Sequence, residues 1–257
     1  MTTVLESRGI TKTFSGIQAL SSVSIDVMEG ERVGLIGPNG AGKTTFFNCL
    51  LGILTPDAGT VRLLGRDIGS LPVYKRARAG IGRTFQRIEL FSDTTVHEHL
   101  LIAERIHNRS GAFWKDLAGR GGPTAAEVAR CDEVLELLGL RDQADEPIEK
   151  LSLGQGRLVE VGRALMTQPS LLLLDEPSSG LDRQETDALA TTLREIQAEK
   201  GFAIMLVEHD VDLEADLTER LYVLDFGSLI AEGPTGPTLS DSRVRQAYLG
   251  TMEAIDE

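Results

Sequence analysis

The chain has 257 residues, is 41% hydrophobic and carries a formal charge of −13. This length supports one well-buried domain rather than two independent ones. The acidic charge repels nucleic-acid phosphates and anionic lipid headgroups, so broad DNA or RNA binding is disfavoured. No apolar run approaches the ~18 residues of a membrane-spanning helix, and the start of the chain lacks the pattern of a secretory signal. We expect Cys49 and Cys131, both at helical spacing among apolar residues, to be buried reduced thiols.

The first part of the chain is rich in predicted strands. Val23, Ile25 and Val27 alternate with polar residues, and a short apolar strand follows at 32–36. From Lys43 the apolar residues take helical spacing, and a glycine at 52 is placed to end that helix. Strand, glycine loop and helix therefore follow one another in order.

Residues 88–160 have a helical pattern. Two pairs, Thr95 with Glu98 and Thr124 with Glu127, match the spacing of a capping box. In this motif the two side chains at the start of a helix each accept a hydrogen bond from the other residue's backbone N–H. A helical insertion is the economical interpretation. The stretch 109–123 carries four glycines and the only tryptophan. It reads either as an exposed irregular loop or as a contact surface for a partner or the membrane face.

After Arg163 the pattern returns to alternating strands and helices. The apolar run LLLLD at 171–175 and the run after residue 201 are continuous and end in charged residues, as buried parallel strands do. Helices are expected at about 183–200 and through Leu217. The predicted fold class is α/β.

The segment from Gly37 to Thr44, GPNGAGKT, matches the phosphate-loop pattern G-x-x-x-x-G-K-[ST]. Its glycines allow successive backbone N–H groups to surround phosphates, and the following helix start adds a positive dipole. Lys43 would reach the β- and γ-phosphates of ATP, and the Thr44 hydroxyl would coordinate Mg²⁺. The expected ATP-binding residues here are Gly37, Pro38, Asn39, Gly40, Ala41, Gly42, Lys43, Thr44 and Thr45.

Two carboxylates, Asp175 and Glu176, follow the buried run LLLL. Open α/β sheets bind ligands at the carboxyl ends of their strands. Asp175 fits a partner of Mg²⁺, and Glu176 fits a general base for the attacking water. Taken alone, the pair could also be a solvated strand end; the phosphate loop upstream favours the functional interpretation.

The motif LSLGQ at 151–155 resembles the signature sequence of ABC ATPases, and further motifs follow the order of that family over nearly the whole chain. The resemblance implies an adenine-stacking Phe14, a metal- and γ-phosphate-sensing Gln86, and a catalytic switch histidine, His209. Alone, these three residues could equally be a core aromatic, a polar strand end and a structural histidine. The resemblance also implies that Ser152 and Gly154 contact the γ-phosphate of the ATP held by an opposite subunit, and that Gln155 and Asp182 are nucleotide-binding residues.

The fold implied by this resemblance is a RecA-like core with an antiparallel β subdomain and an inserted α-helical subdomain. The core and β subdomain would comprise residues 1–87 and 161–257, and the helical subdomain with the signature would comprise 88–160. Two features depart from the usual pattern. Leu153 stands where glycine is more common, and Gly156 and Gly162 interrupt the signature helix at a cost of about 1 kcal/mol each if both are interior.

Stretches such as GIGRTFQRIELF, VEHDVDL and the ending AYLG resemble the ATPases of branched-chain amino-acid uptake systems, a group with urea and amide importers. This implies a second ATPase subunit, two membrane permeases, an extracytoplasmic binding protein, and a peripheral location at the cytoplasmic face of the inner membrane. ATPases of lipopolysaccharide export also resemble the chain. A soluble ABC ATPase of DNA repair or translation is the rival from another class, which the acidic charge and the absence of coiled-coil or zinc-binding insertions disfavour.

Overall fold

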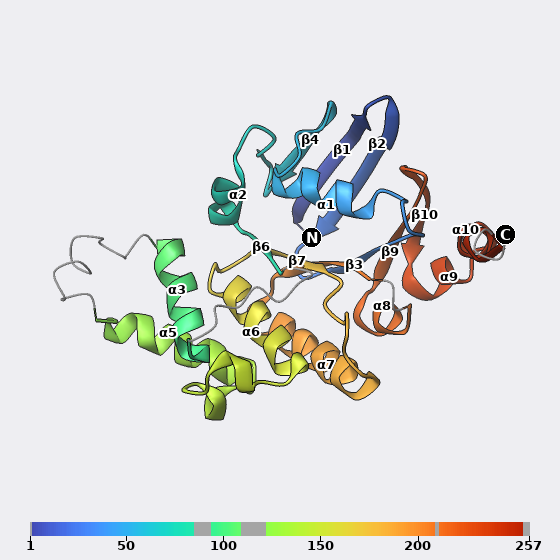
Figure 1. Cartoon of the computed structure of the whole chain (residues 1–257). Helices are drawn as coiled ribbons and strands as arrows, with labels where there is room; N and C mark the ends of the chain where they lie inside the picture. The colour runs from blue at the N-terminus through green and yellow to red at the C-terminus, as the bar shows by residue number, and fades with distance from the viewer. Residues whose placement is uncertain (1, 85–93, 109–121, 209–210, 254–257) are drawn as a thin grey trace.

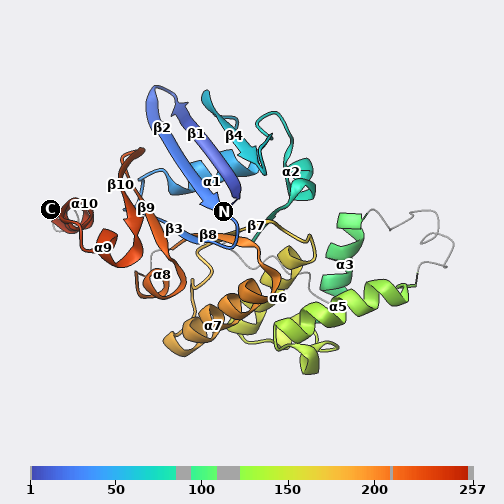
Figure 2. The same cartoon turned by 180° about the vertical axis from the view of Figure 1, so that it is seen from behind.

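The computed structural model describes residues 2–84, 94–108, 122–208 and 211–253. Two sheets and the helices around them form layers (Figure 1). Helix α1 (Lys43–Leu51) lies between the small sheet and the large one, whereas α6 (Leu153–Leu165), α7 (Arg183–Lys200) and α8 (Val211–Leu217) lie beyond the opposite face of the large sheet. The view from behind shows the same order of layers (Figure 2).

The small sheet is antiparallel and has the order β2-β1-β4-β5. Its strands are β1 (Thr3–Phe14), β2 (Ile17–Met28), β4 (Ala58–Leu63) and β5 (Arg66–Asp67). Val23, Ile25 and Val27 are fully buried, as their alternation with polar residues predicts. They join the hydrophobic core that the inner face of α1 completes.

The large sheet has the order β10-β9-β3-β8-β7-β6, and every pairing in it is parallel except that of β10 with β9. Its strands are β3 (Arg32–Ile36), β6 (Ile81–Arg83), β7 (Leu171–Asp175), β8 (Ala203–Val207), β9 (Arg220–Asp225) and β10 (Ser228–Pro234). The continuous apolar run of β7 arises because both faces of this strand are buried. Leu171 and Leu173 face the core around α1, whereas Leu172 and Leu174 face the core formed with the helices on the other side.

The remaining helices surround these sheets. They are α2 (Val73–Ala79), α3 (Val96–Asn108), α5 (Ala125–Leu137), α9 (Thr235–Leu239) and α10 (Ser242–Glu253), with short 3₁₀ turns at Arg141–Gln143 and Ile148–Lys150. Helices α3 and α5 project together to one end of the molecule (Figure 1). None of the helices within the described ranges is both long and apolar enough to cross a membrane.

The helical pattern of 88–160 is confirmed for the described part of that stretch. Thr124 and Glu127 form a complete capping box at the start of α5, and Thr95 and Glu98 bond each other in the same way before α3. Cys131 is buried, as is Cys49, and both are free thiols. Burial raises the pKa of Cys131 to about 11, so this thiol stays protonated and unreactive. The expected boundary at residue 160 falls inside α6, and of the expected irregular stretch 109–123, residues 109–121 lie outside the described residues.

Gly162 has a packing reason that the sequence does not reveal. A Cβ atom at this position would lie 2.6 Å from Cδ1 of Leu138 and 3.0 Å from Cδ2 of Leu100. The missing side chain therefore allows α6 to approach α3 and the end of α5 closely, which offsets the low helix propensity of glycine.

This packing predicts different effects of the same substitution at two helical glycines. Gly162→Ala should lower the free energy of unfolding by about 1–2 kcal/mol, because overpacking costs more than helix propensity gains. Gly236→Ala in α9 meets no packed neighbour within 4 Å outside its own helix, but residue 236 precedes Pro237, whose ring crowds a Cβ in a helical backbone, so the free energy of unfolding should change by less than about 1 kcal/mol. Urea unfolding curves of both variants measure this, and a stabilised Gly162→Ala would contradict the close-packing explanation.

Candidate active site

The phosphate loop connects the end of β3 at Ile36 to the start of α1 at Lys43. Gly37 and Gly42 adopt φ values of 152° and 104°, which favour glycine. Both also lie against backbone: a Cβ at Gly37 would be 2.1 Å from the carbonyl oxygen of Leu224, and one at Gly42 would be 2.7 Å from that of Ala19. Any other residue at either position would displace the loop.

Lys43 is folded back into this loop. Its side chain is buried, and its ammonium donates to the carbonyl oxygens of Gly37 and Pro38, the latter at 3.1 Å. Burial lowers the pKa of Lys43, while the carboxylates of Glu176, Glu214 and Asp175 act to raise it. No side chain caps the start of α1, so its first N–H groups face the site without a carboxylate or hydroxyl partner at the N-cap.

A cavity of about 230 Å³ lies over the loop. Its lining contains much of the expected site: Ala19, Asn39, Gly40, Ala41, Gly42, Lys43, Thr44, Thr45 and Glu176. The structure thus brings Glu176 to the phosphate loop across more than 130 residues of sequence. Phe14 lies at the surface, 42% exposed, with the Lys12 ammonium 5.5 Å from its ring centre. The alternative interpretation of Phe14 as a buried core aromatic is therefore wrong.

Asp175 and Glu176 leave the carboxyl end of β7, as predicted. Asp175 still pairs with Val207 of β8 in the ladder, and the backbone N–H of Glu176 donates to the Val207 carbonyl at 2.8 Å. Glu176 has a φ of 48°, a left-handed conformation that costs non-glycine residues of order 1 kcal/mol. Glu176 lines the cavity over the phosphate loop, whereas Asp175 is not among the residues that line it.

Two further carboxylates near the site were missed by the sequence interpretation. Glu208, at the end of β8, is buried and its Oε1 accepts a 2.7 Å hydrogen bond from the backbone N–H of Ser178. Glu208 thereby holds the segment that follows Glu176. Glu214 of α8 is also buried, and its Oε2 would lie 2.7 Å from a Cβ on Gly34 of β3. A charged residue directly after an apolar strand was the only sequence signal for Glu208, and Glu214 had none.

The signature segment begins α6 and contacts the loop after Glu176. Ser152 caps α6 and exchanges a complete capping box with Gln155, which confirms the helix start. Gly154 donates its N–H to Glu185 Oε1 at 3.4 Å, and the Leu153 side chain lies 3.0 Å from where a Cβ on Gly180 would be. Leu153 therefore packs on the glycine of the SGLD segment.

Asp182 has a structural task in this subunit. Its side chain accepts the N–H of Glu185 at 2.8 Å and so caps α7. Neither Asp182 nor the signature residues are among those that line the cavity over the phosphate loop. Two expected site residues, Gln86 and His209, lie outside the described residues, and their roles stay predictions.

A parallel sheet with a phosphate loop at the end of a central strand, and an acidic strand end beside it, defines a nucleotide-binding ATPase of the P-loop class. The family model for ABC transporters matches residues 20–179. The chain belongs to the ABC transporter family and is an ATP-binding, ATP-hydrolysing member of it.

Comparison with known proteins agrees with this assignment over nearly the whole chain. The chain is 38% identical to the high-affinity branched-chain amino acid transport ATP-binding protein BraF of Pseudomonas aeruginosa, over 96% of this chain and 98% of that one. It is likewise 38% identical to LivG of Salmonella typhimurium, a protein with the same description, with the same coverage. Among solved structures, MJ1267, an ATP-binding cassette of an ABC transporter in its ADP conformation, is 33% identical, with a TM-score of 0.87 over 97% of this chain and 100% of that one.

The buried Glu214 predicts an unusual dependence of stability on pH. Burial, and then the charge of Glu208, raise the pKa of Glu214 well above its usual range. The folded protein therefore keeps this proton to higher pH than the unfolded chain, whose glutamates titrate near pH ~4.3. Stability is lost as pH rises from that value through the folded pKa, by up to about 1.4 kcal/mol per unit.

Glu214→Gln keeps the shape and removes the titration, so the variant should gain stability over wild type as pH rises from 5 to 8. Melting temperatures across this range measure the gain; for a chain of this size, 1 kcal/mol corresponds to about 2–4 °C. Glu219→Gln, at a half-exposed ion pair with Arg32, is the control. Parallel pH profiles for Glu214→Gln and wild type would contradict a proton held by Glu214.

Proposed function

We propose that this chain powers the uptake of branched-chain amino acids, as a peripheral ATPase subunit on the cytoplasmic face of a membrane complex. The observation that carries the catalytic part is the cavity over the phosphate loop that Lys43, Thr44 and Glu176 all line. The support for the substrate is the likeness to BraF and LivG, which extends over nearly the full length of each chain. Two permeases and an extracytoplasmic binding protein would complete the system.

In this proposal, the residues around the cavity divide the chemistry among themselves. The N–H groups at the start of α1 and the Lys43 ammonium hold the phosphates, and Phe14 stacks on the base. Glu176 accepts a proton from the attacking water, a role that needs its carboxylate ionised and within hydrogen-bond reach. The oxygen donors Thr44 and Asp175 fit Mg²⁺, which prefers such ligands and, when bound, neutralises charge on the phosphates.

The set of residues that line the cavity also supports the proposal of a second ATPase subunit. Ser152 and Gly154 stand at the start of α6, where Ser152 is the N-cap, yet they do not line the cavity of their own chain. The positive end of a helix dipole attracts phosphate. We therefore expect the signature of one subunit to close over the ATP of another, with Gln155 and Asp182 at the same interface.

Glu176→Gln tests the assignment of the base. The variant should bind ATP and form the ATP-bound dimer, while hydrolysis falls by about 10²–10⁴-fold, because the amide cannot take the proton. In vesicles that contain the complete complex and its binding protein, wild type should accumulate leucine with ATP and Glu176→Gln should not. Glu219→Gln, far along the sequence from the loop and half-exposed, is a matched control for a changed surface carboxylate.

Normal hydrolysis by Glu176→Gln would contradict the role of the base. An active wild-type complex that hydrolyses ATP but accumulates none of leucine, isoleucine or valine would instead contradict the proposed substrate. Stimulation of that ATPase by lipids would then favour export. The two parts of the proposal therefore fail separately.

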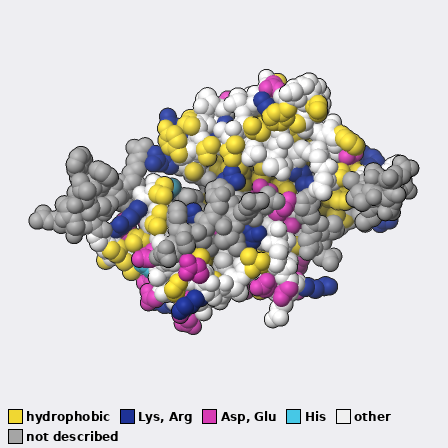
Figure 3. Space-filling model, in the orientation of Figure 1, with side chains coloured by type: hydrophobic (Ala, Val, Ile, Leu, Met, Phe, Trp, Pro, Cys, Tyr) yellow, Lys and Arg dark blue, Asp and Glu magenta, His cyan; other side chains and the backbone are white. Residues whose placement is uncertain are grey.

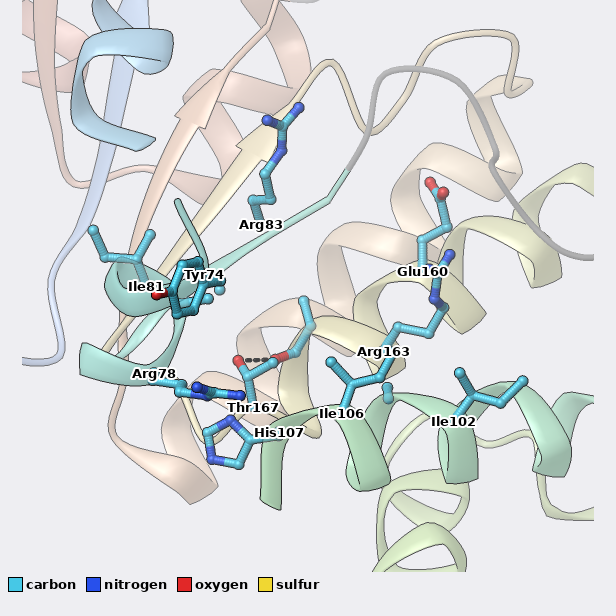
Figure 4. Close-up of a pocket in the computed structure, with 14 residues that line it drawn as sticks. Tyr74, Arg78, Ile81, Arg83, Ile102, Ile106, His107, Glu160, Arg163 and Thr167 are labelled. Carbon is cyan, nitrogen blue, oxygen red and sulfur yellow. Dashed lines mark hydrogen bonds between the residues drawn. The ribbon is translucent and has the colours of Figure 1, made fainter. Parts of the chain in front are cut away.

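A second cavity, of about 330 Å³, lies between α2, β6, α3 and α6. Side chains from all four elements point into one space (Figure 4). Its rim holds two large apolar side chains that are well exposed, Tyr74 at 54% and Ile106 at 69%. Basic side chains accompany them: Arg78, whose guanidinium lies 5.6 Å from the Tyr74 ring centre, and the lining residues Arg83 and Arg163.

This mixture fits a short amphipathic helix of a permease that carries an acidic residue. Exposed aromatic and aliphatic side chains around the cavity provide the apolar contact. The arginines favour a negatively charged partner there, although the chain as a whole carries a net negative charge. Hydrophobic (yellow) and basic (dark blue) side chains lie side by side left of centre in Figure 3, where α2 comes near α3. The predicted segment around Gln86 follows directly after β6, which lines this groove.

Substitutions in the groove should separate coupling from hydrolysis. Arg78→Glu and Ile106→Asp should leave the ATPase rate of the isolated subunit unchanged. Both variants should bind the permeases at least 10-fold more weakly, so the permeases should no longer change the ATPase rate. Leu64→Asp, an exposed apolar position in the β4–β5 turn, is the control. Co-purification and ATPase assays of the complex measure both effects, and full assembly of both groove variants would contradict the docking surface.

A further inference from the structure

The ending AYLG lies in α10, the last helix of the described chain, and α10 packs against the edge of the large sheet. Val244 is buried there, and Tyr248 packs beside it on the same small core. The sheet residues of this core are Ile36, Leu221, Val223 and Ala231. Ile36 is the residue directly before the phosphate loop, so α10 is in contact with the end of β3.

Tyr248 extends this contact into the loop itself. Its hydroxyl oxygen accepts a hydrogen bond from the backbone N–H of Gly37 at 2.9 Å, across 211 positions of sequence. The ladder of β3 with β9 ends one residue earlier, at Ile36 and Val223. Tyr248 thus satisfies the first loop N–H beyond the sheet, a group that would otherwise be buried without that partner.

The carbonyl group of the same residue, Gly37, accepts from the Lys43 ammonium. Gly37 is therefore held at both of its polar groups, by Tyr248 on one side and Lys43 on the other, with the Leu224 carbonyl excluding any side chain. Burial raises the pKa of Tyr248 to about 12, so the hydroxyl remains neutral at physiological pH. A short chain of contacts runs from α10 through one peptide residue to the lysine of the phosphate loop.

From this chain of contacts we infer that Tyr248 is a positioning residue for ATP binding, because it fixes Gly37 and thereby the place from which Lys43 meets the phosphates. The inference deepens the proposed function and rests on the role given there to Lys43. By linkage, a helix that favours the binding-competent loop is itself favoured by ATP. Through Tyr248, helix α10 is then part of the nucleotide site.

Tyr248→Phe removes only the hydroxyl and keeps the ring in its apolar contacts. Without its partner, Gly37 samples more conformations before ATP arrives, so the Kd and KM for ATP should rise roughly 3- to 10-fold, the range expected for one hydrogen bond. The kcat at saturating ATP should change by less than about 2-fold, because the bound nucleotide restores the loop. Binding of a fluorescent ATP analogue and steady-state ATPase kinetics measure these values.

Tyr222→Phe is the matched control. Tyr222 is also buried in the large sheet, on β9, but its hydroxyl bonds Asp26 and Arg220 rather than the loop. This variant should have a lower melting temperature than wild type and an unchanged Kd for ATP. An unchanged Kd in Tyr248→Phe overturns the inference, and so does an equal loss in Tyr222→Phe, which would trace the effect to stability. Failure of wild type itself to bind ATP would instead overturn the proposed function.

Discussion

The buried ammonium of Lys43, held by the carbonyls of Gly37 and Pro38, is the interaction on which the rest of the site depends. A buried charge must be paired or hydrogen-bonded: the loop carbonyls accept the hydrogen bonds, and the charges of Asp175 and Glu176 favour the ammonium. The bond closes the loop on the start of α1. It requires a strand that ends at residue 36, a helix that begins at 43, and glycines between them that allow backbone to approach backbone.

A chain with a net charge of −13 must therefore bind an anionic nucleotide through local groups rather than through its overall field. The start of α1 and Lys43 provide that local positive potential. Acidic residues surround it: Asp175 and Glu176 at the strand end, with Glu208 and Glu214 buried behind. The raised pKa of Glu214 reduces the negative charge there, because a protonated carboxyl group repels no phosphate.

Helix α6 connects the surfaces that an ABC ATPase needs. Its first turn carries Ser152 and Gly154, and the guanidinium of Arg157 donates to the Ser179 carbonyl at 3.0 Å, in the loop after Glu176. Its second half lines the groove between α2 and α3, where Arg163 faces the cavity. Helix α6 carries the signature at one end and lines the groove at the other. The proposed permease contact and the proposed contact with a second subunit therefore lie on the same helix.

The sequence by itself determined the features that arise from local rules. The strand alternation of Val23 to Val27, the phosphate loop and the capping boxes of α3 and α5 were all predictable, because each depends on residues within a few positions of one another. Gln86 and His209 stay predictions. Only the tertiary structure decided why Gly162 is a glycine, that Glu208 and Glu214 are buried, and that Tyr248 reaches Gly37. Those features depend on which distant segments the layered sheet brings into contact, and no local pattern encodes that proximity.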